Sequence, residues 1–94
     1  MSRRRRNQLP NELRRYRRAR GLRLRDVANL IGQSSVAHIA HWEKSRKSPS
    51  LENSIRLAIA VQCPMEVLFL GLYNQLKQEV NEAKDKHHIQ LKYE

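Results

Sequence analysis

The chain has 94 residues, 30% of them charged, and a formal net charge of +10. This length allows one domain, and three Gly, three Pro and no sustained alternating pattern favour an all-helical fold. Cys63 is alone, which excludes an intramolecular disulfide and is compatible with a reducing interior. No apolar run approaches the roughly 20 residues of a membrane span, and no apolar h-region follows the Arg-rich start, so we expect a cytoplasmic protein.

The positive charge is concentrated at the N-terminus. Residues 1–25 hold eleven of the 19 Lys and Arg and a single acid, Glu12, whereas residues 26–94 are formally neutral. Such a block commonly marks a surface for a polyanion, with a solvated tail that aids solubility as the plain alternative. Residues 1–8 are too polar to fold alone, so we expect a disordered arm. Its Arg3, Arg4, Arg5 and Arg6 are predicted to lie along phosphates or to enter a narrow minor groove.

The first helix is predicted from Pro10 to Arg20. Pro10 suits the first helical position and Gly21 suits a left-handed stop. A thin apolar stripe on this helix is formed by Leu9, Leu13 and Tyr16 or Arg17.

Two short apolar-periodic segments follow. In residues 24–31 the apolar side chains recur at the i, i+3, i+4, i+7 spacing of one helix face, and in residues 35–43 Ile39 and Trp42 lie three apart. Gly32 can adopt a positive φ and end the first helix, and Ser34 or Ser35 can cap the second. Two short helices joined by such a turn suggest a helix-turn-helix, which presents its second helix to the major groove of DNA.

A basic loop over residues 44–50 comes next, and Ser50 is a good cap for a fourth helix over residues 51–61. Pro64 is expected to open a fifth helix, which closes the core of a domain at residues 9–70. The fourth helix is expected to direct five apolar side chains toward that core: Leu51, Ile55, Ala58, Ile59 and Val61.

The helical pattern continues through residues 71–94. Apolar residues recur among polar ones at Leu68, Leu72, Leu76, Val80 and Ala83. Such a stripe cannot bury itself, so it either packs back on the domain or pairs with a copy. We favour a dimerisation helix, because the core already has enough apolar residues. Paired domains would then read two half-sites about 34–36 Å apart. Alternatively, Gly71 is a hinge in this helical segment.

The sequence resembles the phage repressor and Cro family of helix-turn-helix domains (the xenobiotic response element family) over about residues 9–70. The matching segments are RARGL, DVANLIG, IAHWE, KSRKSPSL and LAIAVQCPMEVLF. The resemblance implies an all-α, compact five-helix repressor-like domain, here with a C-terminal helical extension. Three departures are Leu24 where the family usually has a polar residue, Ser45 where it has Gly, and one extra residue between Gly32 and Ile39. We place that extra residue in the turn.

The resemblance also implies which residues meet DNA. With Ile39 and Trp42 facing inward, the residues available to base edges are Gln33, Ser34, Ser35, Ala37, His38 and His41. The expected phosphate ligands are Arg23 and Arg25 before and within the first helix of the motif, Lys44, Arg46, Lys47 and Ser48 in the loop after the second, and Asn53 near the start of the fourth helix. Glu43 is expected to hold the fold instead, since phosphates would repel an acid.

No enzyme activity, cofactor or metal is predicted. The chain offers no paired carboxylates, nucleophile–base arrangement or phosphate-cradling Gly loop, and His38 and His41 lack further ligands. We interpret the chain as a sequence-specific double-stranded DNA-binding regulator, a repressor from a prokaryote, phage or mobile element, that dimerises through its C-terminal helix.

Three alternatives stay open. The first is an antitoxin-type autorepressor whose C-terminal helix holds a protein partner instead of a copy. The second is a non-specific RNA- or DNA-coating basic protein, against which stands the absence of an aromatic stacking platform. The third is an adaptor without DNA binding, which the extra turn residue and Leu24 keep open.

Overall fold

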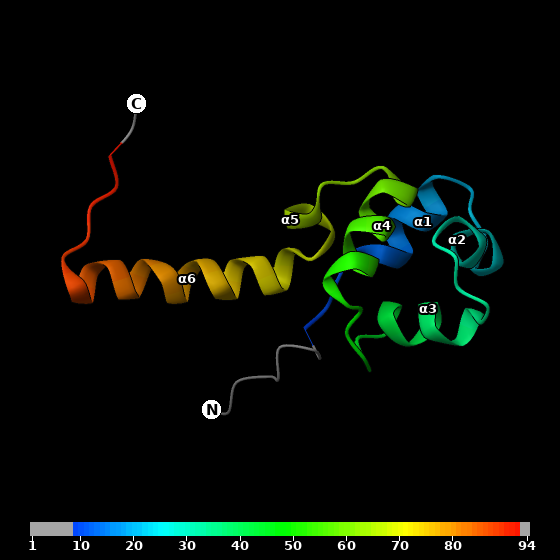
Figure 1. The fold of residues 1–94 in the computed structure, drawn as a ribbon, viewed down its shortest axis with the longest axis horizontal. Helices are drawn as coiled ribbons and strands as arrows, with labels where there is room; N and C mark the ends of the chain where they lie inside the picture. Colours follow the sequence, from blue (N-terminus) through cyan, green and yellow to red (C-terminus); the bar gives the residue numbers. More distant parts are fainter. Residues whose placement is uncertain (1–8, 93–94) are drawn as a thin grey trace.

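The computed structural model describes residues 9–92, which form six helices and no strand (Figure 1). In chain order these are α1 (Leu13–Ala19), α2 (Leu24–Leu30), α3 (Val36–Glu43), α4 (Leu51–Val61), α5 (Met65–Leu68) and α6 (Leu70–His87). The prediction of an all-α fold with a C-terminal helical extension is confirmed. The expected basic arm with Arg3, Arg4, Arg5 and Arg6 lies outside the described residues. Between residues 9 and 92, none of the helices combines the length and the apolar character needed to cross a membrane.

Five of the six described helices are followed, one or two residues after their last residue, by a residue with positive φ. Gly21 (φ 70°) and Gly32 (φ 74°) have this role after α1 and α2, as predicted. After α2, the N–H of Gln33 donates to the carbonyl of Ala28 (2.8 Å) and the N–H of Gly32 donates to that of Asn29 (3.3 Å), the two bonds of a Schellman motif. The corresponding residues after α3, α4 and α6 are Ser45, Gln62 and His88. Each of these helices therefore ends at a defined residue.

The start of α1 differs from the prediction. The helix begins at Leu13 and not at Pro10, because the side chain of Asn11 accepts a hydrogen bond from the N–H of Leu13 (3.0 Å). The N–H of Glu12 donates instead to the carbonyl of Leu68 at the end of α5 (2.8 Å). Residues 9–12 therefore form a non-helical segment that ties the beginning of the domain to its end.

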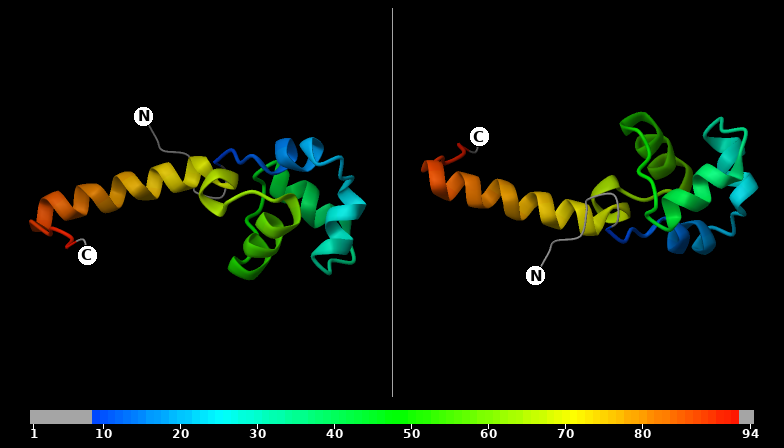
Figure 2. Two further views of the ribbon diagram at one scale, coloured as in Figure 1. Left: turned by 90° about the horizontal axis from the view of Figure 1, so that it is seen from above. Right: turned by 90° about the horizontal axis from the view of Figure 1, so that it is seen from below.

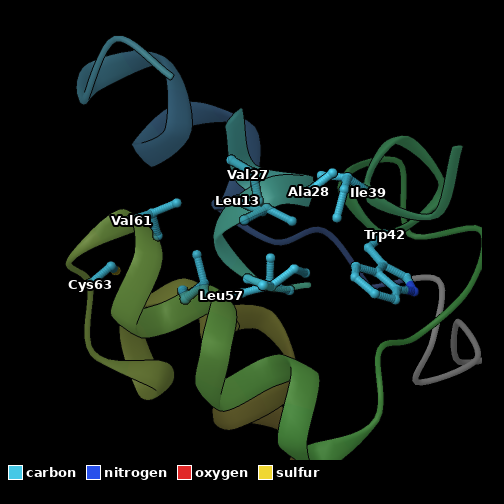
Figure 3. Close-up of a cluster of buried hydrophobic side chains, with 10 residues drawn as sticks. Leu13, Val27, Ala28, Ile39, Trp42, Leu57, Val61 and Cys63 are labelled. Carbon is cyan, nitrogen blue, oxygen red and sulfur yellow. The ribbon is translucent and has the colours of Figure 1, made fainter. Parts of the chain in front are cut away.

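One apolar core lies between the first five helices (Figure 3). Its fully buried side chains include Leu13, Val27, Ile39, Leu57 and Val61. Cys63 lies at the edge of this cluster with 4% exposure, as expected for a structural thiol. Burial raises the pKa of the Cys63 thiol, so that the neutral, unreactive form persists.

The predicted core face of α4 is wrong in part. Leu57 and Val61 are buried, but Leu51, Ile55 and Ile59 are 70%, 42% and 71% exposed. The smaller side chains Ser54 and Ala58 lie on the inward side with Leu57, because α4 packs closely against α1 and α2. The i, i+4, i+8 row of large apolar residues therefore faces outward.

Helix α6 extends sideways from the domain as a separate arm (Figures 1 and 2). Leu68, predicted to belong to its apolar stripe, is instead buried at the end of α5. The proposed hinge at Gly71 does not match the structure, since α6 continues through Gly71 and the helical path breaks at Phe69 (φ −113°, ψ 47°). A Cβ at Gly71 would lie 3.0 Å from the carbonyl oxygen of Pro10, so glycine there permits a close approach to the N-terminal segment.

Candidate nucleic-acid interface

The turn between α2 and α3 sets the position of the predicted recognition helix. Five residues, 31–35, separate the two helices, and Ser35 caps α3 by accepting a hydrogen bond from the N–H of Ala37 through its Oγ (3.1 Å). Ile39 and Trp42 are 0% and 8% exposed, so α3 has the inward face that the sequence predicts.

The six predicted base-contact residues lie along the turn and the outer face of α3. Ser34, Ala37 and His38 are exposed, whereas Gln33, Ser35 and His41 are half-buried. The structure brings two of them together, because Nδ1 of His38 lies 3.0 Å from Oε1 of Gln33. The ring of His38 also stacks on that of Trp42, with 6.1 Å between the centroids and 28° between the planes. His38 is therefore held in place from two sides.

This arrangement gives α3 a defined set of hydrogen-bonding groups. An amide oxygen only accepts, so Nδ1 of His38 donates to Gln33 and the amide nitrogen of Gln33 keeps its donors for a base. Nε2 of a neutral His38 accepts, and that of a protonated His38 donates. Ala37, one helical position before His38, offers a methyl group that suits a thymine methyl. Ser35 has its oxygen engaged in the cap of α3.

Arginines are found at the N-terminal end of α2. The Arg23 side chain is 83% exposed and forms an ion pair with Asp26 (3.3 Å). The exposed Arg25 donates from Nη1 to the carbonyl of Ser34 (3.3 Å), which connects α2 to the turn before α3. A hydrogen bond from the backbone N–H of Arg23 (2.8 Å), followed by that from its side chain, lowers the pKa of Asp26. Arg25 therefore lies beside the turn that leads into α3, and Arg23 lies at the start of α2.

The second group of cations lies beyond the C-terminal end of α3. Lys44, Arg46, Lys47 and Ser48 are all exposed on the loop before α4. The half-buried Asn53 accepts a hydrogen bond from Nη1 of Arg56 through its side-chain oxygen (3.0 Å). Because α3 itself contains no Lys or Arg, positive charge borders the helix at both ends while its centre is neutral.

A buried ion pair supports this surface from beneath. Arg17 of α1 donates from Nε and Nη2 to the carboxylate of Glu43, the last residue of α3. The structural role expected for Glu43 is confirmed, but the sequence did not single out Arg17 as its partner. The available signal was spacing, since Arg17 follows the buried Leu13 by four residues and so lies on the same face of α1.

Ser45 supports the surface in a second way. With φ 57° it adopts the left-handed conformation for which the family pattern has Gly. Its Oγ donates to the carbonyl of Leu9 (2.7 Å) and accepts from Nδ2 of Asn11 (3.3 Å). The serine thus fastens the loop after α3 to the N-terminal segment.

No group of three or more potential metal ligands comes together within residues 9–92. Within this part of the chain, His38 contacts Gln33 and Trp42.

A helix packed on the core through one face, with its other face open between two clusters of cations, defines a DNA-binding helix-turn-helix domain. A family model described as helix-turn-helix matches residues 13–68, and the chain belongs to this family, the Cro/C1-type domains of the xenobiotic response element family. The family is one of DNA-binding regulators and is not enzymatic. No curated protein and no solved structure matches the chain.

Proposed function

We propose that this protein is a sequence-specific transcription regulator that binds double-stranded DNA through α3 and represses by occluding a promoter. The observation that carries the proposal is the neutral outer face of α3, with exposed cations at both of its ends. Cations at the edges bind phosphates of any sequence, whereas the turn and α3 meet the base edges between them.

Within this surface the residues have different tasks. Gln33, Ala37, His38 and His41 read bases, with Ser34 and Ser35 at the entry to the groove. Arg23, Arg25 and Asn53 bind phosphates together with the loop residues Lys44, Arg46, Lys47 and Ser48. The protein acts as a homodimer through α6, so two copies of α3 face two half-sites of one operator.

The proposal is tested by selecting binding sites from a pool of random duplexes at near-physiological salt. Enrichment of a repeated or palindromic motif supports specific readout by two copies. Strong, salt-sensitive binding with no enriched sequence would replace the regulator by a nucleic-acid-coating protein. Absence of binding would instead leave the adaptor, a protein with this fold that does not bind DNA.

An antitoxin-type autorepressor is a second candidate, favoured by the same exposed α6. In that case Tyr73, Leu76 and Val80, which are 45%, 36% and 54% exposed, contact a different protein and not a copy. Sedimentation of the purified chain separates the two candidates. Self-association at micromolar concentration supports the homodimer, and a monomer at all concentrations supports the second candidate.

A further inference from the structure

Helix α6 exposes a row of apolar side chains with the spacing of a coiled-coil seam. Tyr73, Leu76 and Val80 of α6 follow one another at intervals of three and four residues, and Phe69, the residue just before α6, precedes Tyr73 by four. Tyr73, Leu76 and Val80 are between 36% and 54% exposed, and Phe69 is half-buried. After Val80 the seam continues with Ala83 and His87, so only its first half is strongly apolar.

A groove of about 410 Å³ opens beside this apolar half of α6. Its lining includes Phe69, Leu72, Tyr73 and Leu76, together with Leu51 of α4 and Met65 of α5. Lys47 and Ser48 of the loop before α4 also line it. Leu51 is 70% exposed, so the wall on α4 is available to another chain. Seam and groove share Phe69, Tyr73 and Leu76, and therefore form one continuous apolar surface.

We propose that α6 of a second copy of this chain packs antiparallel against α6 and fills this groove. The direction follows from the position of α3 (Figure 1). Helix α6 runs out to one side of the domain, whereas α3 lies along its lower edge in Figure 1 (Figures 1 and 2). The axis of α6 is therefore not directed opposite to the outer face of α3. A parallel pair has its two-fold axis along the helices, which would turn the two α3 faces to opposite sides. An antiparallel pair has its axis across the helices, and both α3 faces meet the same duplex when this axis runs along the outward direction of α3.

The register follows from the distribution of side chains along α6. When the apolar halves overlap, Leu76 faces the second copy's Tyr73 and Val80 faces the second copy's Phe69, so four apolar layers form. The same alignment carries the polar half of α6 past the start of the second copy's α6, beyond the break at Phe69 and toward its α5. Lys84 then lies beside the exposed Glu66 of the second copy, and by symmetry this pair occurs twice. Opposite charges thus meet where the apolar contact ends.

This inference rests on the proposed homodimeric regulator and gives its interface. It is tested by disulfide cross-linking of the full chain in a Cys63→Ala background, with circular dichroism to confirm folding. Glu66→Cys combined with Lys84→Cys is expected to give a covalent dimer on oxidation. A bond within one chain is excluded, since about 21 Å of helix separates Lys84 from the start of α6. Each single variant should stay uncross-linked.

Val80→Cys is the matched control for direction. In the antiparallel pair the two Val80 positions lie about 16 Å apart along the axis, too far for a disulfide, whereas in a parallel pair they are in contact. Efficient cross-linking of Val80→Cys would overturn the proposal. A dimer that fails to cross-link through the Glu66→Cys/Lys84→Cys pair would overturn it equally.

A charge exchange gives an independent measurement. Glu66→Lys and Lys84→Glu should each weaken dimerisation roughly two- to ten-fold, and the double exchange should restore it. Asp85→Lys, which changes charge on the side of α6 away from the seam, should have little effect. Restoration supports the Glu66–Lys84 pair, and additive weakening in the double variant contradicts it.

DNA binding is measured separately on the same proteins. A monomer that still selects a defined sequence would refute this interface and leave the regulator in place. A dimer with the predicted cross-link but no DNA affinity would refute the proposed function and leave the interface.

Discussion

Arg17 and Glu43 join the first helix of the domain to the end of α3, whose last residue is Glu43. Nε of Arg17 lies 2.5 Å from Oε2 of Glu43 and Nη2 lies 3.2 Å from Oε1, while Nη1 donates to the carbonyl of Leu22 (2.9 Å). The two side chains are only 10% and 7% exposed. The guanidinium therefore fixes the end of α3 and the chain entering α2 at once, and with them the angle at which α3 is presented.

The first prediction concerns the removal of one member of this pair. Glu43→Ala or Arg17→Ala leaves a buried charge without its partner and should lower the free energy of unfolding by about 3–5 kcal/mol. The double variant Arg17→Met/Glu43→Leu should be less destabilised than either single variant, because no buried charge remains. Urea unfolding measures the difference, and Arg18→Ala on the exposed side of α1 is the control. A double variant as unstable as the sum of the singles would contradict this account.

The second prediction concerns Ser45, which combines a left-handed backbone with two hydrogen bonds. Ser45→Ala keeps the unfavourable φ and removes the hydroxyl, so it should lower the free energy of unfolding by about 1–2 kcal/mol. Ser45→Gly removes the same bonds but relieves the backbone, so it should be less destabilising than Ser45→Ala. At Gln62, where φ is also positive (55°) and the side chain is exposed, glycine should leave stability unchanged or slightly raised. A Ser45→Gly variant less stable than Ser45→Ala would show that strain plays no part.

The third prediction concerns the pH dependence contributed by Asp26. Hydrogen bonds from the backbone and side chain of Arg23 hold the pKa of Asp26 below its ordinary 3.8. Because the folded-state pKa is lowered, the stabilisation is complete above about pH 3.8 and is lost as the pH falls through the folded-state pKa. Asp26→Asn should therefore lower Tm at pH 7, and its difference from the unmodified protein should shrink below pH 3.8.

Thermal unfolding monitored by circular dichroism from about pH 2.5 to about pH 7 measures this effect. Asp85→Asn, at an exposed position near the C-terminal end of α6, is the control and should not lower Tm at pH 7. A difference between Asp26→Asn and the unmodified protein that persists unchanged into acid would show that the stabilisation does not depend on the ionised carboxylate.

The sequence alone was sufficient to predict those features of the fold that depend on interactions between neighbouring residues. Gly21, Gly32, Ser35 and Ser50 define helix ends through φ preference or side-chain capping, and the structure confirms all four. Ile39 and Trp42 were assigned correctly because α3 is short and has a single apolar face. Helix α3 and its inward face could therefore be located from the sequence.

Tertiary contacts decided the rest. On α4 two faces compete, and the close approach of α1 and α2 selects the one with Ser54 and Ala58 over the row of Leu51, Ile55 and Ile59. At the start of α1 the local bond from Leu13 to Asn11 is accompanied by a bond from Glu12 to Leu68 of α5, a residue far along the chain that no local pattern connects to it. Likewise, the contact of Gln33 with His38 depends on how the turn folds back on α3.

The last prediction separates phosphate binding from base readout. Alanine at Lys44, Arg46 and Lys47 should reduce the slope of log affinity against log salt by about 0.9 for each phosphate that is no longer neutralised, for preferred and random duplexes alike. Gln33→Ala or His38→Ala should instead lower affinity for the preferred duplex about 10- to 100-fold and leave both the slope and random binding unchanged. Because these two side chains contact each other, the double variant should lose less binding free energy than the sum of the two single variants.

Fluorescence anisotropy over a series of salt concentrations gives the affinities and the salt slopes, with Lys77→Ala on α6 as the control. If Gln33→Ala and His38→Ala weakened preferred and random duplexes equally, α3 would contribute charge and shape but no sequence readout.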